Sequence, residues 1–380
     1  MKDRVPDQYL QKRLTTVEKK LPQLEIDGLV AISPPHKGYL SGFTTGVFIA
    51  PGGHLLVTPG GRANQYITGG VDYEDCKTAL EPMGFDITAY SYTDGTNATT
   101  ETARVAKEMQ LKRVGVEGKY ITVEAFKEMK KHMEEAGVEL VAIGEVVDPL
   151  REAKDPWEIE QITRAAEVSK AAFEHVIGWV RPGVTEWELA AELENQLRLG
   201  GCGSSRIAFQ SIVVSGPRSC LPHGSVTTRA LQQGDFVTLD FGATWNGYCA
   251  DVTRTFAVGE ASDQQKAVYS AVLDAQVAAV ERMQPGRERS EASDTGASII
   301  EDRGFGEYMA HGAGGHGIGL EVHEGPSSRS GGTWEVGNVM TMEPGVYIPG
   351  WGGVRIEDDV VITEEGPRII APISKELLEL

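Results

Sequence analysis

The spacing of apolar positions changes several times along the N-terminal part of the chain. Short apolar runs at 27–33, 54–61 and 113–118 predict strands, because apolar runs of this length are typical of buried strands. At 100–111 and 122–137 the apolar residues recur every three or four positions, which predicts amphipathic helices. Strands that alternate with helices indicate an α/β domain with a mixed sheet.

Two helices with well-defined starts follow this domain. Asp155 stands before Pro156 and three residues before Glu158, which is the pattern of a capping box with proline at the first helical position. Thr185 and Glu188 repeat the capping pattern at the second start. The sequence therefore predicts two consecutive helices with fixed first turns.

The last part of the chain is rich in glycine and in short apolar strands. Two further helices are expected there, at 262–283 and 290–303. The change of pattern places a domain boundary near residue 150. We therefore predict an α+β protein, with an α/β domain at 1–150 and a second, α+β domain at 151–380.

One predicted hairpin carries two acidic residues. The run "TLDFGATWNGYCADVTRTF" at 238–256 has Asn-Gly at 246–247, the strongest short-range signal for a two-residue turn. This turn would place Asp240 opposite Thr253, so that Asp240 and Asp251 lie on one face as diagonal neighbours. Two carboxylates so close repel each other unless a cation lies between them. By themselves they could equally be a turn residue and a solvated edge residue, so further ligands are needed.

Three more candidate ligands follow in glycine-rich surroundings. His316 lies in "GGHGIG", and glycine on both sides permits close backbone approach. Glu343 ends one apolar strand, and Glu357 follows the turn-forming "PGWGG" in the next. These two glutamates share a face if their strands pair with even register, which the sequence leaves open.

Four carboxylates and one imidazole form an oxygen-rich donor set. Such a set is large enough for two divalent cations that share bridging carboxylates, and it favours Mn²⁺ or a similarly hard ion over a thiolate zinc site. Two metal ions held close together are a common means of activating water for hydrolysis.

The overall charge excludes several other classes of protein. A formal net charge of −19 over 380 residues argues against binding to nucleic acid or to an anionic membrane surface. The charged N-terminal segment predicts no signal peptide, and no apolar run is long enough for a membrane span. The four cysteines form no CxxC motif, so we expect free thiols and a cytoplasmic protein.

The order of these motifs resembles the pita-bread metallopeptidases. Asp240, Asp251 eleven residues later, His in "GHGIG", Glu in "MEPG" and Glu in "RIED" follow that family's ligand order. "YLSGF" at 39–43 and "LREAKDPWEIEQITRAA" at 150–166 resemble its proline-specific branch, the Xaa-Pro aminopeptidases and Xaa-Pro dipeptidases (prolidases). The resemblance covers essentially the whole chain and implies an N-terminal creatinase/prolidase-like α/β domain at 1–150 and a catalytic pita-bread domain at 151–380.

The resemblance also implies roles for the five ligands. Asp240 and Asp251 would bind two divalent metal ions, with Asp251 as a bridge. His316 and Glu343 would complete one site, and Glu357 would be a second bridge. The metal implied is Mn²⁺, with Co²⁺ or Zn²⁺ as alternatives.

Further residues match the family's substrate-binding positions. His223 in "LPHG" and His323 in "HEGP" correspond to two histidines that contact the substrate and the tetrahedral intermediate, and Arg355 to an arginine beside the last ligand. The family commonly has another histidine four residues before the metal-binding one. Here His311 stands five residues before His316, so a role in substrate contact and no role at all are equally open.

The implied reaction is hydrolysis of the Xaa-Pro bond in proline-containing peptides or dipeptides, with Glu343 as general base. The alternatives are a pita-bread binding protein without catalysis and a metal-free creatinase-like amidinohydrolase. Retention of all five ligands argues against both. The choice between aminopeptidase and dipeptidase is open, and a homodimer is expected from the resemblance alone.

Overall fold

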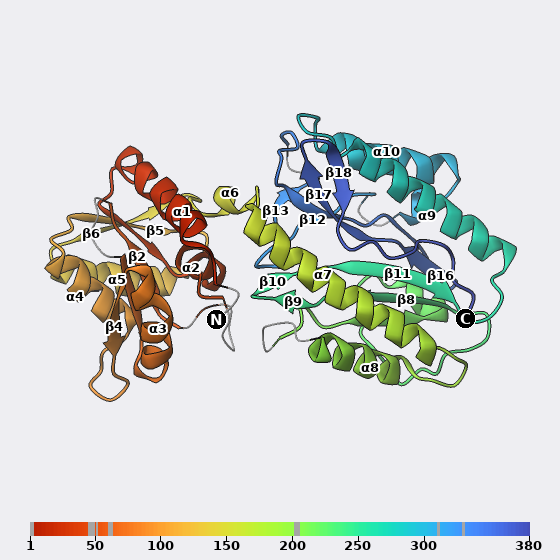
Figure 1. The fold of residues 1–380 in the computed structure, drawn as a ribbon, viewed down its shortest axis with the longest axis horizontal. Helices are drawn as coiled ribbons and strands as arrows, with labels where there is room; N and C mark the ends of the chain where they lie inside the picture. Colours follow the sequence, from red (N-terminus) through yellow and green to blue (C-terminus); the bar gives the residue numbers. More distant parts are fainter. Residues whose placement is uncertain are drawn as a thin grey trace. The chain divides into compact units, whose positions relative to one another are not determined.

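The computed structural model describes residues 4–44, 50, 52–59, 64–200, 206–309, 312–328 and 331–380. The chain divides into two compact units, Met1–Arg151 and Glu152–Leu380, which Figure 1 shows in red to yellow and in yellow-green to blue. In the described part of the chain, none of the helices combines the length and the apolar character that a membrane crossing requires.

The N-terminal unit is built on a mixed sheet. Its strands are β1 (Gly28–Ala31), β2 (His54–Val57), β3 (Asn64–Gly69), β4 (Phe85–Tyr90), β5 (Arg113–Glu117) and β6 (Glu139–Ile143). Their order in the sheet is β4-β3-β2-β1-β5-β6, and β2 runs antiparallel to both of its neighbours. The helices are α1 (Asp7–Lys20), α2 (Pro34–Ser41), α3 (Tyr73–Leu80), α4 (Ala98–Glu108), α5 (Val123–Glu135) and α6 (Asp148–Arg151).

The predicted elements of this unit are confirmed, with shifted ends. Helix α4 begins two residues before its predicted start, because Asn97 caps it and forms a capping box with Thr100. Val114 and Val116 of β5 pack in one core with Met129 and Met133 of α5. The apolar side chains of the helix and the strand therefore pack in one core, as an α/β domain requires.

The C-terminal unit has four α-helices, α7 (Pro156–Val176), α8 (Glu186–Leu199), α9 (Asp263–Arg282) and α10 (Ser290–Asp302), within its described residues. Both predicted capping boxes, Asp155 with Glu158 and Thr185 with Glu188, are formed. Helices α7 and α8 share one apolar core with β8, and α9 and α10 share another with β14 and β17. Figure 1 shows these two helix pairs on opposite sides of the strands.

The strands of this unit form several small antiparallel sheets. They are β7 (Ile212–Ser215), β8 (Phe236–Phe241), β9 (Thr244–Trp245), β10 (Tyr248–Cys249), β11 (Val252–Ala257), β12 (His316–Gly317), β13 (Glu324–Ser327), β14 (Val339–Met342), β15 (Gly345–Ile348), β16 (Gly352–Arg355), β17 (Asp358–Thr363) and β18 (Gly366–Ile369). The two main sheets have the orders β11-β8-β7 and β13-β12-β14-β17-β18. Helix and sheet segments together confirm the predicted α+β class.

The first acidic hairpin has the predicted register. Asp240 pairs with Thr253 in the β8–β11 ladder, and the β9–β10 ladder continues the same register to the turn. Asn246 and Gly247 have φ values of 47° and 83°, so both adopt the left-handed conformation that a type I′ turn needs. Asp240 and Asp251 therefore share a sheet face.

The second acidic hairpin has a register that the sequence left open. Met342 pairs with Asp358 between β14 and β17, and Gly345 pairs with Arg355 between β15 and β16. The two ladders have the same register. Glu343 and Glu357, which lie between the ladders, are therefore opposite each other. Residues that face each other across antiparallel strands lie on the same side of the sheet.

Candidate metal centre

The two hairpins and β12 bring ligand atoms together inside the C-terminal unit. Atoms of Asp251, His316 and Glu357 all lie within 4.8 Å of one another. His316 Nε2 is 3.3 Å from a carboxylate oxygen of Glu343 and 3.7 Å from one of Asp251. Side chains from three separate segments therefore converge on one point.

Asp240 joins this group through a buried arginine. An Arg355 Nη atom donates to Asp240 Oδ2 at 2.5 Å, and Arg355 Nε donates to Thr253 Oγ1 at 3.0 Å. The Thr253 hydroxyl donates in turn to Glu357 Oε2 at 2.6 Å. Each of these carboxylates thus has one oxygen fixed by a hydrogen bond, and the other oxygen is left for a different partner.

The glycines around His316 are required by close backbone packing. A Cβ on Gly315 would lie 2.1 Å from the Thr341 carbonyl oxygen, and one on Gly317 would lie 2.3 Å from Gly325 backbone atoms. Real side chains do not tolerate such distances, so only glycine lets β12 approach β13 and β14 this closely. The backbone of His316 is held by its N–H, which donates to Thr341 Oγ1 at 3.1 Å.

His316 is prepared to act as a ligand through Nε2. Its Nδ1 lies 3.2 Å from the carbonyl oxygen of Gly317, which accepts a hydrogen bond and so favours the proton on Nδ1. Burial lowers the pKa of His316, which favours the neutral imidazole. A neutral ring with its proton on Nδ1 has a lone pair on Nε2, and this atom points toward the carboxylates.

Without a cation, the carboxylates are electrostatically unfavourable. Burial, and then repulsion by neighbouring carboxylates, raises the pKa of Asp251 and of Glu357 well above their usual ranges. The pKa of Glu343 is also raised, again chiefly by burial. Groups placed in this way favour protonation or metal binding over a bare negative charge.

Unpartnered oxygens give the direct test of a metal site. Asp240 Oδ1, Asp251 Oδ1 and Glu357 Oε1 are buried and have no hydrogen-bond partner among the described residues. Buried polar atoms nearly always have a partner, so these three unpartnered carboxylate oxygens need an explanation. Four carboxylates with one imidazole are a suitable donor set for hard divalent cations, and the residues present therefore fit such ions.

The site opens into a cleft of about 880 Å³. His316, Glu343 and Arg355 line it, together with His223 and His323. The rings of His316 and His323 meet edge to face with their centroids 4.0 Å apart. Burial and the nearby His316 lower the pKa of His323, so this ring is neutral near pH 7 and can donate an N–H into the cleft.

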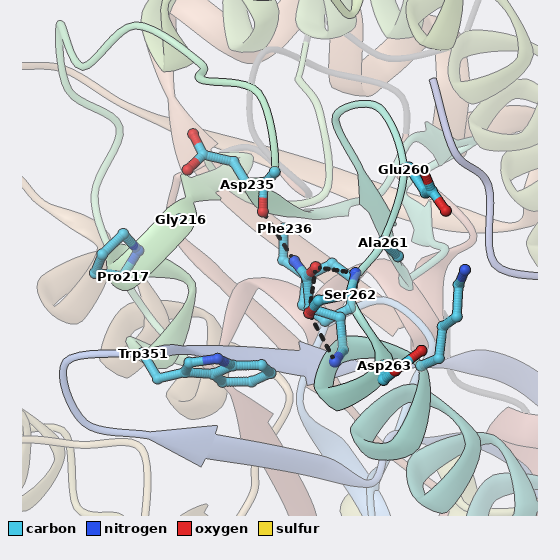
Figure 2. A pocket seen from close by; sticks show the side chains of 12 residues that line it. Gly216, Pro217, Asp235, Phe236, Glu260, Ala261, Ser262, Asp263 and Trp351 are labelled. Atoms are coloured by element: carbon cyan, nitrogen blue, oxygen red, sulfur yellow. Dashed lines mark hydrogen bonds between the residues drawn. The ribbon is translucent and has the colours of Figure 1, made fainter.

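A second hollow, of about 710 Å³, lies beside the N-terminus of α9. Figure 2 shows Glu260 and Asp263 on one side of it and Trp351 on another, with hydrogen bonds of the α9 capping box between them. Its lining contains no histidine and none of the predicted ligands. The hydrolytic chemistry predicted from the sequence therefore belongs to the first cleft.

Every predicted site residue within the described part of the chain lies at this cleft or directly behind it. His311 lies outside the described residues. Sequence reasoning placed Thr253 opposite Asp240 but gave it no role, and it missed Thr341 and Tyr347. Both of these position predicted residues: Thr341 donates to Glu343 at 3.3 Å, and the Tyr347 hydroxyl lies 2.7 Å from Arg355 Nη1.

Sequence reasoning also missed Asp359. Its carboxylate accepts the Asp251 backbone N–H at 3.1 Å, and burial raises its pKa to about 8. It supports the loop that presents Asp251 to the metal centre, and nothing in its strand pattern marks it apart from its neighbour Asp358.

The N-terminal unit contains another buried His/Glu/Asp cluster. His36 Nδ1 lies 2.6 Å from Glu117 Oε2, and its Nε2 lies 3.4 Å from Asp148 Oδ2. Glu117 Oε1 already accepts two backbone N–H groups, and Asp148 accepts the Tyr120 hydroxyl. His36 Nε2 and Asp148 Oδ2 have no hydrogen-bond partner among the described residues, and the two carboxylates raise the pKa of His36 against the effect of its burial, which favours a protonated imidazole between them.

Comparisons with known proteins agree with this geometry. Residues 160–364 match the model of metallopeptidase family M24, and residues 13–153 match the creatinase/prolidase N-terminal domain. The uncharacterized peptidase YqhT of Bacillus subtilis is 40% identical over 97% of this chain and all of its own length.

Solved structures are similar over the same extent. An Xaa-Pro dipeptidase from Bacillus anthracis has a TM-score of 0.88 at 36% identity, covering 98% of this chain and 100% of the other. An X-Pro aminopeptidase from Thermotoga maritima has a TM-score of 0.85 at 31% identity, covering 96% and 98%. The predicted order of a creatinase-like domain and a pita-bread domain is confirmed. The chain is a metallopeptidase that belongs to metallopeptidase family M24.

Proposed function

We propose that the protein hydrolyses the Xaa-Pro bond, at the N-terminus of peptides or in dipeptides, with two bound divalent metal ions. The observation that carries this proposal is the cluster of Asp251, Glu357 and His316, in which each carboxylate has one buried oxygen without a hydrogen-bond partner among the described residues. The preference for proline is supported by the similar dipeptidase and aminopeptidase named above, which share this chain's length and fold.

The metal ions would be held by all five predicted ligands. Asp240 and Asp251 would bind through the oxygens that no donor occupies, with Asp251 and Glu357 as bridges. His316 and Glu343 would complete one of the two sites. Mn²⁺ is the ion we propose, because the donors are mostly oxygen, with Co²⁺ or Zn²⁺ as substitutes. Such ions lower the pKa of bound water and polarise the substrate carbonyl.

Residues of the chain would supply the remaining steps. Glu343 has a raised pKa, and its carboxylate is the proposed base that takes the proton of the attacking water. His323 would donate an N–H to the oxygen on which negative charge develops, and His223 would contact the substrate in the same cleft. Arg355 would hold Asp240 in place and compensate its charge.

The test is hydrolysis of matched peptides by protein that has been stripped of metal and reloaded with Mn²⁺. We expect cleavage of Xaa-Pro and Xaa-Pro-Yaa, much slower cleavage of Xaa-Ala and Xaa-Ala-Yaa, and loss of activity on chelation. The ratio of the two proline substrates separates a dipeptidase from an aminopeptidase. Full activity in metal-free protein, or equal rates on the alanine peptides, would refute the proposal.

The other functions implied by the fold are less well supported. A binding protein without catalysis or a metal-free amidinohydrolase would have no need for three buried carboxylates and the half-buried Glu343 around one imidazole. The homodimer and the cytoplasmic location are also proposals. Sedimentation tests the first and cell fractionation the second.

A further inference from the structure

The segment Glu152–Lys154, which precedes α7, is bound firmly to the strands of the metal centre. The Lys154 backbone N–H donates to the Gly337 carbonyl at 2.8 Å, and Ala153 forms an antiparallel bridge with Asn338. The Asn338 amide donates to the Glu152 carbonyl at 3.2 Å. This segment belongs to the "REAKDP" motif, to which no part of the proposed chemistry assigns a role.

The side chain of Lys154 is completely buried beside β13. Its ammonium group lies 3.1 Å from Glu324 Oε1, and it donates to the Gly325 carbonyl at 3.3 Å. A third contact, to the Glu152 carbonyl, measures 3.5 Å. An ammonium group has three N–H donors, and all three have an acceptor here. A buried charge of this kind is stable only because these acceptors are fixed in place.

Both of the contacts on β13 adjoin His323. Glu324 is the next residue and Gly325 the one after, and the second carboxylate oxygen of Glu324 accepts the Glu321 N–H at 3.1 Å. Lys154 therefore fixes the backbone on the C-terminal side of His323, and the Glu324 side chain connects it to the backbone on the N-terminal side.

His323 itself has few contacts of its own. Its side chain is exposed to the cleft, and its ring contact is with His316. No hydrogen bond to the ring occurs among the described residues. The point from which this ring extends into the cleft is set by the backbone of 321–325, which the Lys154–Glu324 pair holds.

We propose that Lys154 is a positioning residue for catalysis, which acts by holding His323 at the cleft. The inference rests on the proposed function, in which His323 stabilises developing charge. It also gives a role to the "REAKDP" motif: its lysine is part of the support of the active site.

The test is a double-mutant cycle of Lys154→Met and His323→Ala, measured on an Xaa-Pro peptide with Mn²⁺ loaded. Supporting residues behind a reacting group typically affect activity by about 10–100-fold, so we expect Lys154→Met to lower kcat by that factor with little change in KM. The metal content should remain that of the wild type. In the His323→Ala background, Lys154→Met should have no further effect on kcat, because the group that it positions is gone.

Two further variants distinguish a general folding defect from the loss of positioning. Lys154→Met together with Glu324→Gln removes both charges, so no unpaired carboxylate stays buried, and it should show the same loss in kcat. Arg289→Met is the matched control. Arg289 forms an ion pair with Glu152 at 3.1 Å on the same segment, so this variant tests whether the loss of any cation from the segment lowers kcat; we expect the kcat of the wild type.

The outcomes separate this inference from the proposed function. If Lys154→Met lowers kcat by the same factor with and without His323, Lys154 acts on the fold in general and the inference is wrong. If Arg289→Met loses as much kcat as Lys154→Met, the same conclusion follows. If the metal-loaded wild type cleaves no Xaa-Pro peptide, the proposed function itself has failed.

Discussion

Some side chains of the site are candidate metal ligands and others are proposed to contact the substrate, and substitutions can distinguish these two roles. Asp251 is a candidate metal ligand whose charge is unfavourable when no cation is present, because burial and its acidic neighbours raise its pKa. His323 is outside the ligand set and faces the cleft. Changes at these two residues should therefore alter different properties, namely metal binding in one case and turnover in the other.

We predict that Asp251→Asn abolishes metal binding and activity but makes the metal-free protein more stable. An acid whose pKa is raised on folding weakens stability as the pH rises above its unfolded pKa, so the gain should be largest near neutral pH. We expect a gain on the order of 1 kcal/mol, or a melting temperature about 2–4 °C higher. Wild-type protein should instead be stabilised by added Mn²⁺, by mass action.

Thermal unfolding with and without Mn²⁺ measures both effects. All six tryptophans lie beyond residue 152, so their fluorescence follows the unfolding of the C-terminal unit. Thr341→Ser is a suitable control, since it retains every charge and the hydroxyl. An active Asp251→Asn protein, or a wild type whose melting temperature does not change with Mn²⁺, would show that the hairpin aspartates bind no metal ion.

We predict that His323→Ala keeps its metal ions and loses turnover. Removal of one group that stabilises developing negative charge typically lowers the rate by about 10²–10³. Metal analysis and kcat, measured on the same preparation, give the two numbers. Loss of the metal ions in this variant would instead place His323 among the ligands.

The hairpins show how far elements were predictable. The β8–β11 register followed from Asn-Gly alone, because a two-residue turn fixes every pair beyond it. The register of the second hairpin did not, since Pro349, Gly350 and Trp351 form a three-residue loop, and the sequence allows loops of other lengths there. The strands that adjoin Glu343 and Glu357 are formed as predicted and only their pairing needed the structure, whereas the role of the two glutamates as ligands stays a prediction.

Contacts between distant elements were the least predictable part. Arg355 joins Asp240, Thr253 and Tyr347, which come from three strands, and no periodicity in the sequence connects them. The same holds for Lys154 and Glu324, which lie 170 residues apart in the chain. Local patterns predict which residues share a face, whereas such long-range partners depend on how the sheets pack.

At the scale of the hairpin, we predict that Gly247→Ala weakens both folding and metal binding. Its φ of 83° is left-handed, which costs a residue with a Cβ about 1–2 kcal/mol. The strain falls on the turn that aligns Asp251 with Asp240. Denaturant unfolding and Mn²⁺ titration measure the effect, and Gly178→Ala, at a glycine with open surroundings and no left-handed φ, should be close to wild type. Equal behaviour of the two variants would contradict the type I′ turn.

For the molecule as a whole, the two units should respond differently to pH. In the N-terminal unit, burial alone would lower the pKa of His36, but its hydrogen bonds with Asp148 and Glu117 outweigh burial, and the pKa is raised. The same contacts lower the pKa of Glu117, against its own burial. A raised histidine pKa contributes stability below the unfolded value of about 6.5, and this stability is lost as the pH rises through the folded value.

We predict that His36→Gln destabilises the N-terminal unit by on the order of 3–5 kcal/mol at pH 6, because the buried carboxylate of Glu117 loses its cation. The loss should become smaller as the pH rises through the folded pKa of His36. Hydrogen exchange of peptides from β1 and β5, corrected for the intrinsic rate, measures it. His132→Gln, on the surface of α5 in the same unit, is the control. A loss that is independent of pH would mean that His36 is neutral.

The common register of the β15–β16 and β14–β17 ladders decides which changes in chain length the metal centre tolerates. Residues added at the tip, between Ile348 and Gly352, only lengthen the loop and leave every pair below it intact. One residue added between Glu343 and Gly345, or between Arg355 and Glu357, would move one glutamate to the opposite face of its strand. Insertions and deletions among relatives should therefore gather at the hairpin tips, and the number of residues from tip to ligand should be equal on the two strands.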